Sequence, residues 1–128
     1  MARNSRSPRR LAVDGRDHLW AVRHEHRDGA DRGCREVLAV RRDGDPGRLL
    51  IVFEGGPGRL LPDGYLHSGA VGTAGGALFN LHRPGTVRAL VDEAVRRGWR
   101  GGPRTERLDG WTMLDALAGR EEGPEPAP

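Results

Sequence analysis

The segment from Pro84 to Trp99 constrains the fold of this chain more than any other. Its apolar side chains recur at the spacing that places them on one face of an α-helix: Val87, Leu90, Val91, Ala94 and Val95. Pro84 suits the first helical turn, since the N–H that it lacks would have no partner there. Gly98 can take the left-handed conformation that ends a helix, and Trp99 can then fold back onto it. The pattern predicts an amphipathic helix over 84–97 that packs on a sheet.

Three strands are predicted before this helix. Residues 19–26 alternate between apolar and polar side chains, and residues 34–42 form a second candidate strand. Residues 49–53 are apolar throughout, which is typical of a central strand covered on both faces. Turn-forming residues at 28–33 and 43–47 separate the three. We therefore predict a meander of three antiparallel strands.

A glycine-rich region follows, with eight glycines among the 22 residues of 55–76. A loop of that length without structure is unusual in a compact domain, so we expect a short strand within it. Asp109 can cap a short C-terminal helix. The remaining strands are predicted at these positions: 59–61 or 65–67, 77–81 and 105–108.

These elements together predict an α+β domain. An antiparallel sheet of about four to six strands packs the main helix, 84–97, against one face. The other face is expected to be partly solvated or used for pairing with another subunit. We assign the domain to 11–118, flanked by a disordered basic arm at 1–10 and a disordered acidic, proline-containing tail at 119–128.

Composition excludes several kinds of chemistry. All 21 basic side chains are arginine, so Schiff-base catalysis, a pyridoxal-phosphate anchor and a P-loop lysine are ruled out. The lone cysteine, Cys34, cannot form an internal disulfide, and the chain has no run of 18 apolar residues. We therefore expect a cytoplasmic protein that does not enter a membrane.

Much of the positive charge lies in the N-terminal arm, at Arg3, Arg6, Arg9 and Arg10. Four arginines in a flexible arm can neutralise nucleic-acid phosphates without reading sequence. The three tryptophans could in principle stack on bases. Each one stands beside core-type residues, however, so we predict that they pack inside the domain.

The segments Trp20–Arg23 and Pro84–Trp99 carry a resemblance. Together they resemble a pattern found in small uncharacterised bacterial proteins, some of them integron-cassette-like: Thr-Pro, an apolar-periodic helix, Gly-Trp and a short final strand. The chain departs from this pattern at Arg83, where Thr is usual, and at Gly101, where Pro is usual. The resemblance implies the α+β fold, and because that group has no assigned activity it implies no catalytic residue.

Two histidines, His24 and His26, would share one face of the first strand, because side chains alternate along a strand. With His67, His82 or Cys34 nearby they could bind zinc or iron. The alternative is a polar strand end beside a turn. We favour this alternative and expect neither a metal nor another cofactor.

His67 and Ser68 are candidate residues for a site in the glycine-rich loop. A serine nucleophile at Ser68 would need His82 or His24 as its base, brought there by the fold. Asp63 or Asp92 would then orient the base. The simpler interpretation is an ordinary turn serine. Backbone amides of 69–76 could likewise cradle a phosphate, but we favour a flexible loop there.

Arginines on neighbouring predicted strands raise one further possibility. Arg23, Arg41 and Arg42 could form an anion-binding face. Glu25 and Glu36 could equally neutralise them across the hairpin. The sequence alone leaves both arrangements open.

The leading functional hypothesis is a non-catalytic protein-interaction or accessory module, with a defence-associated role among the options and a protein partner or a second copy as its ligand. The first alternative is nucleic-acid binding through the arginine-rich arm. The second is a small enzyme or ligand binder that uses the 55–76 loop as a lid. We lean against an enzyme, because no complete acid–base, metal or nucleophile arrangement can be read from the sequence.

Overall fold

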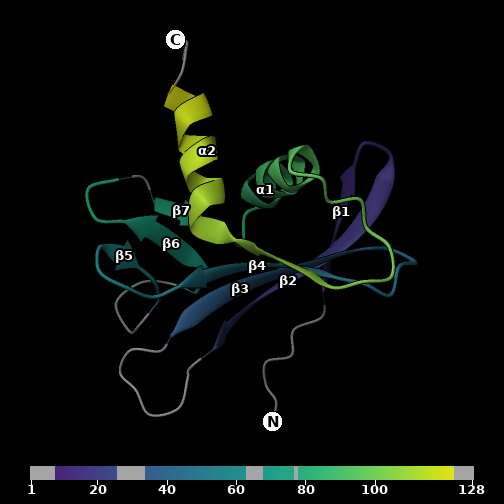
Figure 1. The fold of residues 1–128 in the computed structure, drawn as a ribbon, viewed down its shortest axis with the longest axis horizontal. Coiled ribbons are helices and arrows are strands. Elements are labelled where there is room, and N and C mark those ends of the chain that lie inside the picture. Colours follow the sequence, from purple (N-terminus) through teal and green to yellow (C-terminus); the bar gives the residue numbers. More distant parts are fainter. Residues whose placement is uncertain (1–7, 26–33, 63–67, 77, 123–128) are drawn as a thin grey trace.

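The computed structural model of the protein describes residues 8–25, 34–62, 68–76 and 78–122, and their strands form two sheets (Figure 1). The larger sheet has five strands in the order β1-β2-β3-β4-β8: β1 (Arg9–Val13), β2 (Arg16–Glu25), β3 (Arg35–Arg42), β4 (Leu49–Glu54) and β8 (Glu106–Asp109). The smaller has three strands in the order β5-β6-β7: β5 (Arg59–Leu60), β6 (Ala70–Thr73) and β7 (Leu78–Asn80).

The predicted antiparallel meander is confirmed as β2-β3-β4. Val22 lies opposite Leu38, and Leu38 lies opposite Ile51 across the next pair of strands. The last strand, β8, joins β4 in the parallel direction because the chain returns to the sheet after a helix. The α+β class is thus as predicted, with the strands divided between two sheets.

The main helix, α1 (Pro84–Arg96), is confirmed within one residue of its predicted end. Its C-terminus closes as expected: Gly98 has a φ of +109°, and the Trp99 amide donates to the Ala94 carbonyl at 3.0 Å. The second helix, α2 (Gly110–Glu122), begins where the Asp109 carboxylate accepts the Trp111 amide at 3.3 Å. No helix in the described part of the chain is long and apolar enough to cross a membrane.

Both helices lie on the same side of the five-stranded sheet, and the main core fills the space between them and the sheet (Figure 1). Phe53 on β4 meets Trp111 edge-on, with ring centroids 5.3 Å apart. Trp111 also donates its indole N–H to the Glu54 carbonyl at 2.9 Å. All three tryptophans are buried, which confirms their predicted packing role: Trp20, Trp99 and Trp111.

Four sequence predictions need correction. β1 begins at Arg9, so the last two residues assigned to the arm belong to the sheet. α2 continues to Glu122, into the segment assigned to the tail, and is as long as α1, at 13 residues. Residues 70–73, predicted as flexible loop, form β6 between two partner strands, because pairing on both edges overrides the weak strand preference of glycine. The single predicted sheet is two sheets.

The opposite side of the five-stranded sheet, which we call the outer face, is unusual in composition. Side chains alternate along each strand, so the neighbours of the core-facing Leu38 and Ile51 point outward. They form a second apolar group, the outer apolar cluster, which consists of Val37, Ala39, Leu50 and Val52. Figure 1 shows no described helix on this side.

The turn before β4 is packed tightly against the loop at residues 102–104. Gly47 donates its amide to the Gly102 carbonyl at 2.9 Å, and a Cβ added to it would lie 2.2 Å from the Arg104 carbonyl oxygen. Backbone atoms must therefore move if a side chain is added. We expect Gly47→Ala to lower the free energy of unfolding by about 1–3 kcal/mol, measured by urea denaturation. The control Gly85→Ala meets nothing within 4 Å. Equal stabilities of the two variants would contradict this packing.

Candidate functional site

A network of polar side chains lies where the two sheets meet, and its central residue is a buried glutamate. Glu36 is fully buried (0% exposed) on the core side of β3. Its Oε1 lies 2.6 Å from Nδ1 of His24, and its Oε2 accepts the Gly69 amide at 3.0 Å. Burial raises the pKa of this carboxyl above its ordinary value, although both contacts oppose the shift. Glu36 thus ties β2 and β3 to the turn before β6.

The neighbouring residue of this turn meets a second histidine. Ser68 Oγ lies 3.0 Å from His82 Nε2, and the His82 amide donates to Asn80 Oδ1 at 2.8 Å. Gly69 has a φ of +84°, and a Cβ there would lie 2.5 Å from His82 Cδ2. The histidine ring therefore packs on the bare glycine backbone. The structure thus brings Ser68 and His82 together, a contact that the sequence predicted only if the fold placed the two side by side.

Among the residues that the structure describes, no complete acyl-transfer arrangement forms in this polar network, which is made of His24, Glu36, Ser68, Gly69 and His82. An oxyanion needs a free donor near the nucleophile, and the Gly69 amide already binds Glu36. The predicted orienter Asp92 instead contacts Arg88 on α1 at 3.3 Å. We therefore interpret the network as a clamp that holds the β6 turn on the sheet.

Several predicted partners of the network lie outside the described residues: His26, Asp63 and His67. Within the described ranges, no group of three or more metal-ligating side chains comes together. His24, the described member of the metal pair, binds a carboxylate instead.

Glu36 gives the fold a defined pH dependence. Its folded-state pKa is raised above the ordinary 4.5, so the folded protein holds this proton more tightly than the unfolded chain does. Stability from this group must then fall as pH rises from about 4.5 through the folded pKa. We expect the unfolding free energy of the wild type, minus that of Glu36→Gln, to decrease between about pH 4.5 and 7 in urea titrations. A constant difference would contradict the assignment. His18, whose burial lowers its pKa, is present in both proteins and cancels.

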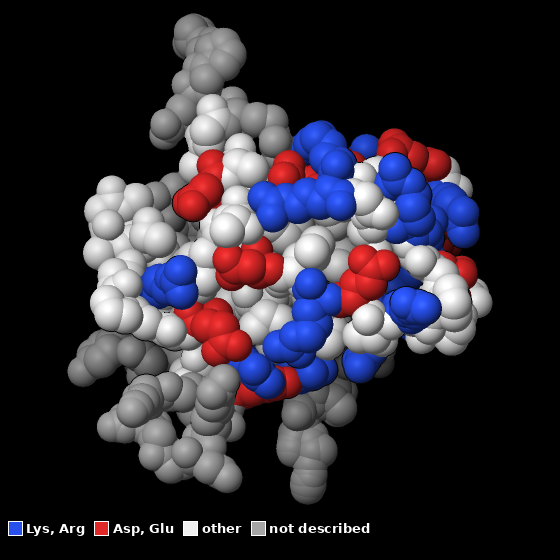
Figure 2. Space-filling model, viewed as in Figure 1, with Lys and Arg blue, Asp and Glu red and all other residues white. Residues whose placement is uncertain are grey.

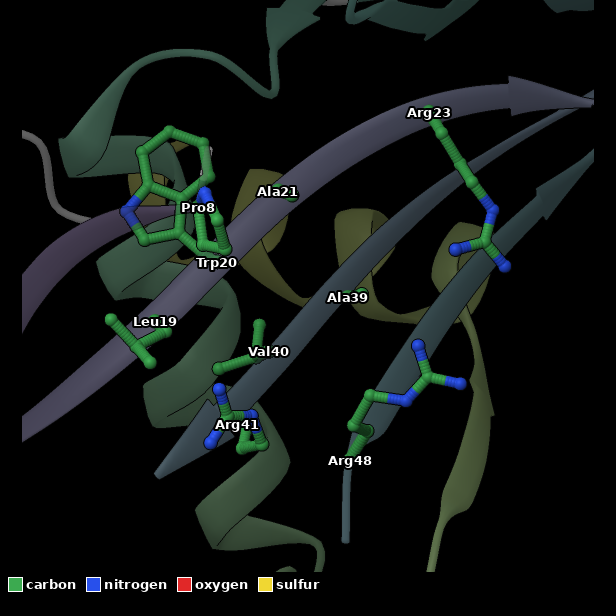
Figure 3. Close-up of a pocket in the computed structure, with 9 residues that line it drawn as sticks. All are labelled: Pro8, Leu19, Trp20, Ala21, Arg23, Ala39, Val40, Arg41 and Arg48. Atoms are coloured by element: carbon green, nitrogen blue, oxygen red, sulfur yellow. The ribbon is translucent and has the colours of Figure 1, made fainter. Parts of the chain in front are cut away.

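A second candidate site lies on the outer face. Arg23, Arg41 and Arg48 line a pocket of about 160 Å³, which we call the arginine pocket, with Leu19, Ala21 and Ala39 among its apolar lining (Figure 3). In Figure 3 the side chains of Arg23, on β2, and Arg48, just before β4, extend toward each other, with Ala39 of β3 between them. No acidic residue of the described chain lines the pocket.

The ion pairs around the arginine pocket are unevenly distributed. Arg23 Nε donates to Glu25 at 2.6 Å, and the same carboxylate accepts from Arg35 Nε at 2.8 Å. In the part of the chain that the structure describes, Arg41 and Arg48 make no ion pair. Two of the pocket's three guanidinium groups therefore have no carboxylate partner within the described ranges.

The three arginines of the predicted anion-binding face do not all share one face of the sheet. Arg23 and Arg41 share the outer face, but Arg42 lies on the other side, with its guanidinium 5.2 Å from the Trp99 ring centroid. Glu36 also faces the core, so the prediction that it neutralises these arginines was wrong. Successive residues of a strand point to opposite faces, which separates Arg41 from Arg42. The sequence analysis missed Arg48.

Two arginines of the predicted arm, Arg9 and Arg10, are among the described residues, and both contact other parts of the domain. Arg9 donates to the His82 carbonyl at 2.9 Å and lies 4.7 Å from the Trp20 ring centroid. Arg10 forms ion pairs with Asp17 and Asp43. Arg3 and Arg6 lie outside the described residues. On the face seen in Figure 2, basic and acidic side chains lie interspersed, so no single-sign patch covers it.

The glycine-rich region forms a hollow of its own. A pocket of about 160 Å³ lies between the β6-β7 hairpin and α2, and its lining includes Phe79, Trp111 and Asp115. Ser68, the described loop candidate, is not among the residues that line it. The hollow is mainly apolar and shares no side chain with the polar network.

The geometry defines an α+β domain whose two helices both lie on one face of its main sheet (Figure 1). Comparison with protein-family models, with curated proteins and with solved structures finds no match to this chain. The resemblance to integron-cassette-like proteins remains a prediction.

Proposed function

We propose that this protein is a non-catalytic interaction module that binds an acidic protein partner through the outer face of its five-stranded sheet. One observation carries the proposal: the outer apolar cluster lies beside Arg41 and Arg48, which have no carboxylate partner among the described residues. Strands that face water on one side usually alternate apolar and polar residues. Here β3 and β4 are apolar on both faces, as is typical of strands covered on both sides.

The composition of the outer face favours a protein ligand. Protein interfaces combine an apolar centre with a polar rim, and arginine is enriched in them. In the outer apolar cluster Val37, Leu50 and Val52 are at most 8% exposed and Ala39 is partly buried, so a partner meets the cluster mainly at Ala39, beside Arg41 and Arg48. Since the pocket lining is positively charged and lacks described carboxylates, electrostatic complementarity favours an acidic partner.

Capture from the native cell extract tests the proposal with matched charge reversals. Wild-type protein should retain a stoichiometric acidic partner, and the pair Arg41→Glu and Arg48→Glu should reduce its recovery at least about tenfold. The control pair is Arg16→Glu and Arg83→Glu, two exposed arginines without a described ion pair, which changes net charge equally and should leave recovery unchanged. Equal loss in both pairs, or no partner, would contradict the proposal. Self-association of the purified protein would assign the face to a second copy instead.

Nucleic-acid binding is the second candidate. Pro8 is the first described residue, it lines the arginine pocket, and Arg3 and Arg6 precede it in the sequence. An arm and pocket acting together would bind phosphates with steep salt dependence. Since β1 starts at Arg9, the test compares the full chain with one starting at Pro8. Equal affinity of both for single-stranded DNA and RNA would exclude a role for the arm.

The same hypothesis bears on the cellular compartment in which the protein acts and on its biological role. We infer a cytoplasmic site of action, in keeping with the single cysteine, Cys34. An accessory or defence-associated role would suit a small binding module. Fractionation of the native cell, with the partner identified from the capture experiment, tests both.

A further inference from the structure

We infer that the arginine pocket is a binding site for a phosphate monoester, carried by the protein partner as a phosphorylated side chain. This inference rests on the proposed function and names the group by which the partner is anchored. It concerns the pocket lined by Arg23, Arg41 and Arg48, whereas the proposed function concerns the whole outer face.

The pocket exists because small residues meet at its base. Ala21 on β2 lies directly opposite Ala39 on β3, while the adjacent pairs combine an arginine with a larger apolar residue. Leu19 lies opposite Arg41 on one side, and Arg23 lies opposite Val37 on the other. Two methyl groups between longer side chains leave a hollow of about 160 Å³. An anionic group entering it would have guanidinium groups around it and an apolar surface beneath.

The guanidinium groups that line this hollow come from β2, from β3 and from the residue before β4. No described carboxylate binds any side-chain nitrogen of Arg41 or Arg48. The ion pair between Arg23 and Glu25 uses Nε, and no described carboxylate binds the two terminal nitrogens of Arg23. Arg41 and Arg48 line the same pocket, and a bound anion reduces the repulsion between their positive charges. The lining therefore favours an occupant with more than one negative charge.

A phosphate monoester fits this lining better than a carboxylate does. It carries about −1.5 to −2 charge at neutral pH and offers three strong acceptor oxygens. A carboxylate carries one charge, which a single arginine can satisfy with two parallel hydrogen bonds. Clusters of arginines are a recurring solution for binding phosphorylated side chains. The pocket has three guanidinium groups, and the one on Arg23 pairs with the carboxylate of Glu25. The remaining charge of about +2 matches the charge of a phosphate dianion.

Nuclear magnetic resonance of the full-length protein tests the inference with small probes. Acetyl-phosphoserine amide should produce saturable shifts of the Ala21 and Ala39 amides, and acetyl-glutamate amide should bind at least about tenfold more weakly. Below about pH 5, where the phosphate is a monoanion, the affinity for acetyl-phosphoserine amide should also fall.

Two variants localise the binding. Ala39→Leu fills the hollow without changing charge, and Arg48→Gln removes one guanidinium; each should weaken phosphoserine binding about tenfold or more. Arg48 is exposed, so its variant keeps the test valid if Ala39→Leu does not fold.

Three results would each overturn the inference: no saturable shift at the two alanines, equal binding of the glutamate probe, or binding of inorganic phosphate alone. Partner capture that depends on Arg41 and Arg48 without phosphoserine binding would remove this inference and leave the proposed function standing. Phosphoserine binding without any captured partner would remove the proposed function and with it the phosphorylated partner, leaving only a small-molecule site.

Discussion

Replacement of Leu90 by aspartate is expected to abolish the folded state. Leu90 is fully buried in α1, where it packs into the core beneath both helices. The variant loses the transfer and packing energy of a leucine, about 2–5 kcal/mol, and also buries a charge without a partner. The sum approaches the 5–15 kcal/mol total stability of an ordinary domain. Thermal unfolding followed by circular dichroism should show no cooperative transition.

The matched control for this prediction is Leu90→Met, which keeps volume and polarity and should cost less than about 1.5 kcal/mol. A soluble Leu90→Asp protein that melts cooperatively near the wild-type temperature would show that α1 does not pack on the sheet as described.

Replacement of Glu36 by alanine should have the second largest effect. The buried carboxylate binds His24 and the Gly69 amide, so its removal leaves a buried N–H without an acceptor and opens a cavity. We expect a loss of about 2–4 kcal/mol in urea denaturation. Because Gly69 fixes the turn before β6, its amide should also exchange with deuterium faster than in the wild type.

Glu54→Ala is the control for the glutamate prediction. Glu54 pairs with Arg35 at 3.3 Å and has a side chain that is 43% exposed, so its loss should cost less than about 1 kcal/mol. If the two alanine variants were equally stable, Glu36 would not clamp the turn, and the polar network would lose its structural interpretation.

The fold was largely predictable where local patterns carry the information. The period of Val87, Leu90 and Val91 identified α1, and turn residues separated the strands of the meander. β6 was missed because its local signal is only a cluster of glycines, whose weak strand preference is overridden by pairing with β5 and β7. β8 was predicted as a strand, but its parallel pairing with β4 depends on how the chain returns from α1.

The candidate sites were less predictable, because they depend on which face of the sheet each side chain occupies and on the register between strands. The pair Ser68–His82 joins residues 14 apart, which the antiparallel pairing of β6 with β7 brings together. The arginine pocket needed the register that places Ala21 opposite Ala39. Arg48 had a usable signal: it precedes β4 by one residue, and alternation places it on the same face as Leu50.

The central claim is that the outer face binds a protein in the cell. Site-specific photo-crosslinking tests it most directly, with the photoreactive residue placed at Arg107, an exposed residue opposite Leu50 of the outer apolar cluster, or at Asp92 on α1 as the control. We expect a single heavier adduct from position 107 in living cells, containing an acidic protein, and none from position 92. An adduct from position 92 alone, or from neither position, would contradict it.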